Sequence, residues 1–220
     1  MKETILVFSG HSDDLQIGMG GSIAKYAEEG KRIINIIFTS GEGSSPWIKG
    51  DVIKEERIRE AIKIDQFLGC EKTLFLSIRD KDLFGGLKHK GLIAFVNNKT
   101  VIEKVANVIK KYNPDKIFTH SKADPHEDHR CANEIVFKAL AQTNSKASVF
   151  AFEVWNVLNE NHPRMYVDVS KTFKKKIEAM KMFKSQKMSI YALFIQVILR
   201  AFFSGFHAKC RFAERFYKIR

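Results

Sequence analysis

Short apolar runs alternate with longer stretches of helical periodicity along most of the chain. Runs rich in β-branched and aromatic residues predict strands at 4 to 9, 33 to 39, 73 to 77 and 115 to 119, with further extended runs at 148 to 158 and 164 to 169. Because strands that alternate with helices form parallel sheets, the pattern predicts an open, mostly parallel α/β sheet with helices on both faces.

The helices between these runs are predicted from their periodicity and from the residues that end them. We expect helices near 20 to 29, 51 to 68, 101 to 112, 128 to 142 and 171 to 184. Gly30 and Gly69 follow the first two helices, where glycine fits the left-handed conformation that ends many helices. The long, glycine-bearing loops at 40 to 50 and 79 to 91 are predicted to be binding segments.

The size and composition of the chain indicate one globular domain over residues 1 to 220. With 220 residues, 45% of them hydrophobic, the chain can bury one substantial core but is short for two. The apolar run near the N-terminus is short and lacks a cleavage site, so the expected compartment is the cytoplasm. Cys70, Cys131 and Cys210 stand far apart, so a bound metal would use histidines and carboxylates.

The net charge of +12 is concentrated in the last fifth of the chain. Residues 171 to 220 hold 13 Lys or Arg out of 37 but only Glu178 and Glu214 among the 25 acidic residues. The rest of the chain is therefore close to neutral, and we expect no nucleic-acid partner.

This basic segment contains an apolar run from 190 to 203, interrupted only by Gln196 and Arg200. These two residues lie four apart and would share one narrow face of a helix. The run is short for a bilayer span, so a packed helix ranks first, an interfacial membrane helix second and a transmembrane segment last. The flanking lysines suit solvent, or an anionic lipid or substrate, which makes peripheral association with the inner membrane face a hypothesis. The oligomeric state is left open, a homo-oligomer included.

Two clusters of polar side chains directly follow predicted strands. Residues 10 to 14 (GHSDD) follow the first strand, and residues 124 to 129 (DPHEDH) follow the strand at 115 to 119. In an open parallel sheet, ligands bind outside the carboxyl ends of the strands, where the strand order reverses. Each cluster alone could be a helix cap or a solvated loop. Together they supply histidines and carboxylates with an open position, the usual composition of a catalytic zinc site.

The adjacent Asp13 and Asp14 should have different roles, because two carboxylates crowded on one ion would repel each other. One would bind the metal, and the other would take a proton from the water that the metal activates. His126 precedes His129 by three residues and could donate a hydrogen bond to a developing oxyanion, with Asp128 orienting its imidazole. His120 ends a predicted strand. We expect it to be a polar residue with satisfied hydrogen bonds at the strand end, and we leave it out of the catalytic residues.

Several motifs, taken in order, resemble the PIG-L or LmbE-like zinc de-N-acetylases. The matching residues are His11-Ser12-Asp13-Asp14, Gly20-Gly21, Arg57 with Glu60, Leu68-Gly69, Asp124 to His129, and Ala213-Glu214-Arg215-Phe216. The resemblance spans the chain and implies a Rossmann-like fold. It departs from the family pattern at Ser12, where proline is usual, and at Leu15-Gln16, where an acidic residue commonly follows. Losing the proline should loosen the turn that presents His11 and Asp13.

The resemblance also implies roles for individual residues. His11, Asp14 and His129 would bind zinc, Asp13 would be the base, His126 would stabilise the tetrahedral intermediate, and Arg57 would contact substrate. The implied reaction removes the N-acetyl group from an N-acetylglucosamine-type conjugate, whose carrier could be anionic or lipid-linked. Zinc is inferred from the ligand types, with other divalent metals open.

Two other functions compete with this reading. One is an amidase acting on another N-acylated small molecule. The other is a non-catalytic metal-binding or nucleotide-binding Rossmann-like protein. For nucleotide binding, however, Gly18, Gly20 and Gly21 have the wrong spacing and come too late after the strand.

Overall fold

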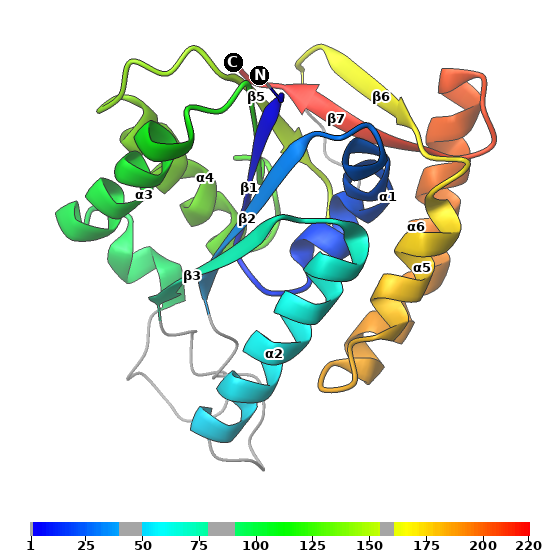
Figure 1. Cartoon of the computed structure of the whole chain (residues 1–220), viewed down its shortest axis with the longest axis horizontal. Helices are drawn as coiled ribbons and strands as arrows, with labels where there is room; N and C mark the ends of the chain where they lie inside the picture. The colour runs from blue at the N-terminus through cyan, green and yellow to red at the C-terminus, as the bar shows by residue number, and fades with distance from the viewer. Residues whose placement is uncertain (1, 40–49, 79–90, 155–160) are drawn as a thin grey trace.

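The computed structural model describes residues 2–39, 50–78, 91–154 and 161–220, and one sheet runs through the centre of the molecule (Figure 1). Its strands are β1 (Thr4–Ser9), β2 (Arg32–Thr39), β3 (Lys72–Ile78), β4 (Lys116–Thr119), β5 (Ser148–Phe152), β6 (Arg164–Asp168) and β7 (Ala213–Lys218). Most of the two loops predicted to be binding segments lies outside the described residues.

The order of the seven strands is β3-β2-β1-β4-β5-β7-β6. The first five in this order are parallel, and β7 runs antiparallel between β5 and β6. The chain leaves β1 toward β2 on one side, while β4 lies on its other side, so the strand order reverses between β1 and β4. This is the crevice in which α/β sheets bind ligands, and the predicted fold class is confirmed.

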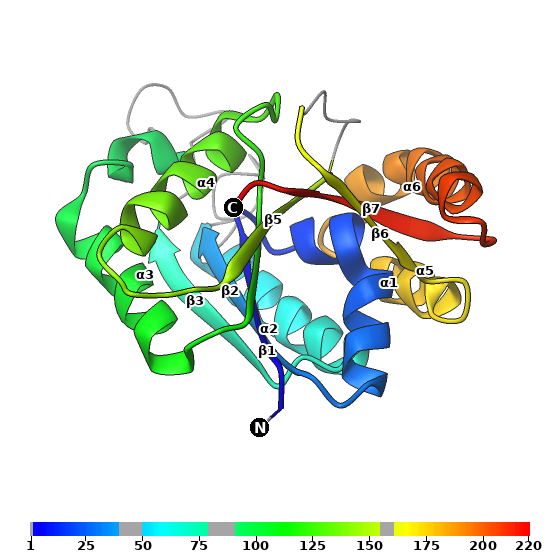
Figure 2. The same ribbon diagram turned by 90° about the horizontal axis from the view of Figure 1, so that it is seen from above.

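Helices cover both faces of the sheet (Figure 1, Figure 2). The helices are α1 (Asp14–Glu28), α2 (Gly50–Leu68), the short 3-10 helix η2 (Gly91–Phe95), α3 (Lys99–Tyr112), α4 (Glu127–Leu140), α5 (Phe173–Lys181) and α6 (Lys187–Ala208). Side chains along β1 point alternately to the two faces of the sheet and belong to two hydrophobic cores. Ile5 and Val7 pack with α1, α2, α5 and α6, whereas Leu6 and Phe8 pack with α3 and α4. The central strands β1, β2 and β4 are thus buried on both sides, and the chain forms one α/β domain.

The first helix begins at Asp14, six residues before the predicted start at Gly20. Its glycines lower the helical signal, and the helix is irregular at Met19, where φ is −146°. Close packing explains the choice of Gly18, since a Cβ there would lie 2.5 Å from Phe152 Cδ2. The sequence pattern therefore missed the part of α1 nearest the site.

Strand β7 was not predicted, because its sequence mixes charged and aromatic residues. Its Glu214 is buried and accepts hydrogen bonds from the Gly21 and Ser22 amides, at 3.1 and 2.7 Å, and from Lys176 Nζ at 2.6 Å. Burial lowers the pKa of Lys176, against the opposing charge of Glu214. This buried pair ties α1 and α5 to the sheet.

The extended run predicted at 148 to 158 is shorter in the structure. Strand β5 ends at Phe152, residues 153 and 154 are not part of a strand, and residues 155–160 lie outside the described residues.

Candidate metal centre

The two turns that follow β1 and β4 each lead straight into a helix. Asp13 occupies the N-cap position of α1 and His126 that of α4, yet neither side chain makes a capping hydrogen bond in the described structure. Capping therefore does not explain either residue. Both side chains stand at helix N-termini, where the backbone carries partial positive charge that favours anions.

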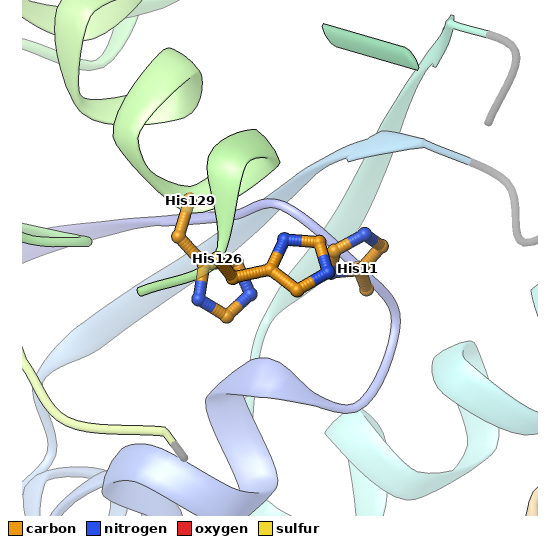
Figure 3. A group of neighbouring side chains, drawn as sticks. All are labelled: His11, His126 and His129. Atoms are coloured by element: carbon orange, nitrogen blue, oxygen red, sulfur yellow. The ribbon is translucent and has the colours of Figure 1, made fainter. Parts of the chain in front are cut away.

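Three histidines from these turns converge (Figure 3). His11 comes from the turn after β1, and His126 and His129 come from the start of α4. The ring centroids lie 4.9 Å apart for His11 and His126, 4.6 Å for His126 and His129, and 5.3 Å for His11 and His129. One nitrogen from each ring lies within 4.8 Å of the others, a spacing that suits a shared metal ion.

Asp14 joins the same cluster through both of its carboxylate oxygens. Its Oδ1 lies 3.2 Å from His129 Nε2, and its Oδ2 lies 3.1 Å from His120 Nε2 and accepts a hydrogen bond from the His11 amide at 2.7 Å. Asp14, His120 and His129 form a second group with ligand atoms within 4.8 Å, and it shares His129 with the first. The three predicted ligands, His11, Asp14 and His129, therefore occupy one cluster.

The chemistry of this cluster fits a divalent cation. Imidazole nitrogens and a carboxylate are the donors that zinc and similar metals prefer. The Nδ1 atom of His126 is buried and has no hydrogen-bond partner in the described part of the chain. An unpartnered buried polar atom costs about 1–3 kcal/mol, a cost that a ligand bound to this cluster would relieve.

His120, which sequence reasoning excluded from the site, is fully buried beside it. Its ring stacks on His129 at a centroid distance of 3.9 Å and an interplanar angle of 10°. Its Nε2 accepts a hydrogen bond from the Gly10 amide at 2.8 Å. Through this hydrogen bond His120 holds the turn that carries Asp14. Its position directly after β4, at the carboxyl end of the strand, was the feature of the sequence that could have indicated its place beside the site.

Two aspartates hold histidine rings of the cluster. Asp124 Oδ1 lies 3.1 Å from His129 Nδ1 and accepts a hydrogen bond from the His126 amide at 2.8 Å. A carboxylate behind a metal-binding histidine fixes the ring and raises its basicity. Asp124 was not among the predicted site residues. Asp128, expected to orient His126, instead places Oδ2 3.5 Å from His11 Nε2, while its Oδ1 accepts from the Leu92 amide at 2.9 Å.

The neighbouring aspartates differ in acidity, as their predicted roles require. Burial and the charge of Asp14 raise the pKa of Asp13 to about 6, against the opposing charges of His11 and Arg57. Burial also acts to raise the pKa of Asp14, but His129 and His120 outweigh it and hold that pKa well below its usual value. Asp14 is therefore an anion suited to bind a cation, while Asp13 is suited to exchange a proton near neutral pH.

Arg57 and Glu60, one helical turn apart on α2, have separate environments. The charge of Arg57 lowers the pKa of Asp13, so its guanidinium is within electrostatic reach of the site. Glu60 accepts hydrogen bonds from the Lys184 and Ser185 amides, at 2.9 and 3.1 Å, and also one from the Ser185 hydroxyl. Glu60 thus ties α2 to the segment before α6, whereas Arg57 acts electrostatically on the cluster.

Comparison with known proteins connects this geometry to a family. The sequence model described as PIG-L, GlcNAc-PI de-N-acetylase, matches residues 6–140, which include both polar clusters. The uncharacterized deacetylase YaiS of Escherichia coli strain K12 is 24% identical over 190 residues, covering 84% of this chain and 92% of the relative.

Two solved structures share the fold. The N,N'-diacetylchitobiose deacetylase of Pyrococcus horikoshii has a TM-score of 0.79 at 22% identity, covering 97% of this chain and 82% of that one. The 4-carboxy-2-hydroxymuconate hydratase of Pseudomonas putida KT2440 has a TM-score of 0.80 at 20% identity, covering 99% and 96%. At these identities the two structures establish the fold alone.

Proposed function

The chain belongs to the PIG-L family of N-deacetylases, which are amide hydrolases, and from this premise we propose that it deacetylates an N-acetylglucosamine-type aminosugar conjugate with zinc as its cofactor. One observation carries the proposal: His11, Asp14 and His129 share a cluster beside Asp13, a buried carboxyl group whose pKa is raised to about 6. The name of the Pyrococcus horikoshii deacetylase, which acts on an N-acetylated disaccharide, supports the aminosugar assignment.

In the proposed mechanism, His11, Asp14 and His129 would hold the metal. When bound, it would supply polarisation of the amide carbonyl and a lowered pKa for water. Asp13 takes the proton from the attacking water and returns it to the departing amine. Its raised pKa suits both steps, because the carboxyl group can gain and lose a proton near neutral pH.

His126 and Arg57 complete the proposed site. Burial and the neighbouring His11 and His129 lower the pKa of His126 to about 4, so its imidazole is neutral and carries one N–H. We assign that N–H to the oxyanion that forms at the carbonyl. Arg57 orients the substrate, with its guanidinium near Asp13.

The test is a product assay on the purified, zinc-reconstituted protein. N-acetylglucosamine conjugates with neutral, anionic and lipid aglycones are screened for acetate release, and 4-carboxy-2-hydroxymuconate is included because a hydratase shares the fold. We expect acetate from at least one conjugate, and none after metal removal or in His129→Ala. Hydration of the muconate without acetate release from any conjugate would contradict the proposal.

A further inference from the structure

Helix α6 presents a broad apolar surface to solvent. From Tyr191 to Phe206, every exposed side chain that the structure describes on this helix is apolar. We call the large ones the α6 apolar face: Tyr191, Ile195, Ile198, Leu199, Phe202, Phe203 and Phe206. Ile195 is 73% exposed and Phe206 is 79% exposed. A contiguous exposed surface of this kind marks a site of interaction on a soluble domain.

The polarity of α6 is the reverse of that expected for a solvated surface helix. Arg200 points inward and donates hydrogen bonds to the carbonyl oxygens of Val154, at 3.0 Å, and Ile17, at 3.2 Å. Leu193 and Val197 are also buried against the domain. The inner side is therefore mixed and the outer side is apolar, and an apolar outer side is typical of a helix that is covered or in contact with lipid. The prediction of a packed helix is confirmed for the inner side only.

The charged residues that flank this face along the chain are all positive. The exposed Lys184 and Lys187 stand at the start of α6, and the exposed Lys209 and Arg211 follow its end. No acidic residue occurs in the sequence between Glu178 and Glu214. Two copies of the chain meeting through this face would bring these like charges together, whereas an anionic lipid surface would attract them.

The inner side of α6 argues against a helix that crosses the bilayer. By length and composition Ile190–Ala208 could do so, and the helix as a whole has 22 residues, beyond the 14-residue run that the sequence suggested. A third of its apolar window is buried in the domain, however. A spanning helix would have to expose that surface and remove the carbonyl partners of Arg200.

We propose that the α6 apolar face docks the protein onto an anionic lipid bilayer, with its phenylalanines in the interface and the flanking basic residues at the headgroups. Aromatic side chains favour this interfacial depth, and basic residues add electrostatic attraction. Gln186, the residue before α6, donates a hydrogen bond to Ser12 in the metal-site turn at 3.0 Å. Docking would therefore hold the candidate metal centre close to the membrane through the first turn of the helix.

The experiment is flotation of the full-length protein with vesicles of phosphatidylcholine, alone or mixed equally with phosphatidylglycerol. We expect flotation with the anionic vesicles, at least tenfold weaker binding to the neutral ones, and weakening at high salt. The double variant F202Q/F206Q should lose at least tenfold in binding. The matched control is F67Q, which changes a phenylalanine that is 36% exposed on α2 and should bind like the wild type.

Three kinds of result would overturn the proposal. One is a failed binding assay, in which the wild-type protein stays at the bottom of the gradient with anionic vesicles or the double variant floats as well as the wild type. Another is a lipid-free dimer, seen by light scattering, that F202Q/F206Q converts to monomers, because it would make a second copy the occupant of the face. The third is protein that remains in vesicles after alkaline carbonate extraction, which would indicate a spanning helix. Unchanged thermal melting of the variants shows that loss of binding is not loss of fold.

Discussion

Gln186 Nε2 donates a hydrogen bond to Ser12 Oγ over 3.0 Å, and the contact fastens the start of α6 to the turn between His11 and Asp13. Ser12 stands where related sequences usually have proline, and a looser turn was expected. Ser12 is instead buried, at 3% exposure, and its hydroxyl is engaged across a sequence distance of 174 residues. A tertiary hydrogen bond thus contributes to holding a turn that a proline would stiffen locally.

Replacing Gln186 by Met should weaken both the fold and the site. The Ser12 hydroxyl would lose its buried donor, which costs about 1–2 kcal/mol of folding free energy. Acetate release should fall several-fold in kcat while KM changes little, because the turn presents Asp13. Chemical denaturation and steady-state kinetics measure the two effects, with the exposed Gln142→Met as control. Wild-type kcat together with lost stability would show that the contact is structural only.

Replacing Asp124 by Asn should weaken metal binding without abolishing it. Asp124 contacts His129 from behind, so the variant keeps every proposed ligand but loses the charge that fixes the imidazole. We expect metal affinity to fall by about 10- to 100-fold. Competition with a chromophoric chelator measures it. Glu127→Gln, a substitution at the partly exposed first residue of α4, is the control, and equal affinities for the two variants would show that Asp124 does not support the metal site.

The buried Asp65 should make the protein less stable as pH rises through mildly acidic values. Burial raises the pKa of Asp65 to about 6, although Thr73, Asn35 and Gln16 donate hydrogen bonds to its carboxylate. In the unfolded chain the group ionises near pH 4, so its contribution is fully present below about pH 4 and is lost as pH rises to about 6.

The size of this effect follows from the difference in pKa. A pKa of about 6 in the folded chain against about 4 in the unfolded chain corresponds to about 3 kcal/mol in the free energy of unfolding. Urea denaturation of the wild type and of Asp65→Asn between pH 4 and 7 isolates it, since the variant cannot ionise there. We expect the stability of the wild type relative to the variant to decline over this range, and a constant difference would rule out the linkage.

The site could be located from the sequence because functional residues of a parallel sheet follow the carboxyl ends of its strands. The order of apolar runs places Asp14 and His129 after strands that can be neighbours, and the sheet order β2-β1-β4 brings them together. Contacts between distant segments were out of reach of pattern analysis. The stacking of His120 on His129 depends on side-chain direction, and the bond between Gln186 and Ser12 depends on how α6 packs.

The elements that sequence reasoning missed are those in which tertiary structure overrides local preference. The first turns of α1 contain Gly18, which close packing against Phe152 requires, and β7 is ordered by pairing with β5 and β6. Periodicity placed Gln196 and Arg200 on one face of α6 but did not show which way that face points. Arg200 turned inward because backbone carbonyls of Ile17 and Val154 were there to accept its hydrogen bonds. Gln16 stands where the family pattern has an acidic residue, and its side chain donates a hydrogen bond to the buried Asp65.

The most direct test of the account is a paired measurement of bound zinc and acetate release in Asp13→Asn. Asp13 is assigned to proton transfer and not to metal binding, so the variant should retain wild-type zinc content while its kcat falls by about 10²- to 10⁴-fold. His129→Ala, the companion variant, should lose zinc and activity together, because His129 belongs to both metal-binding groups of side chains. An Asp13→Asn protein that binds zinc and still releases acetate at the wild-type rate would contradict the account.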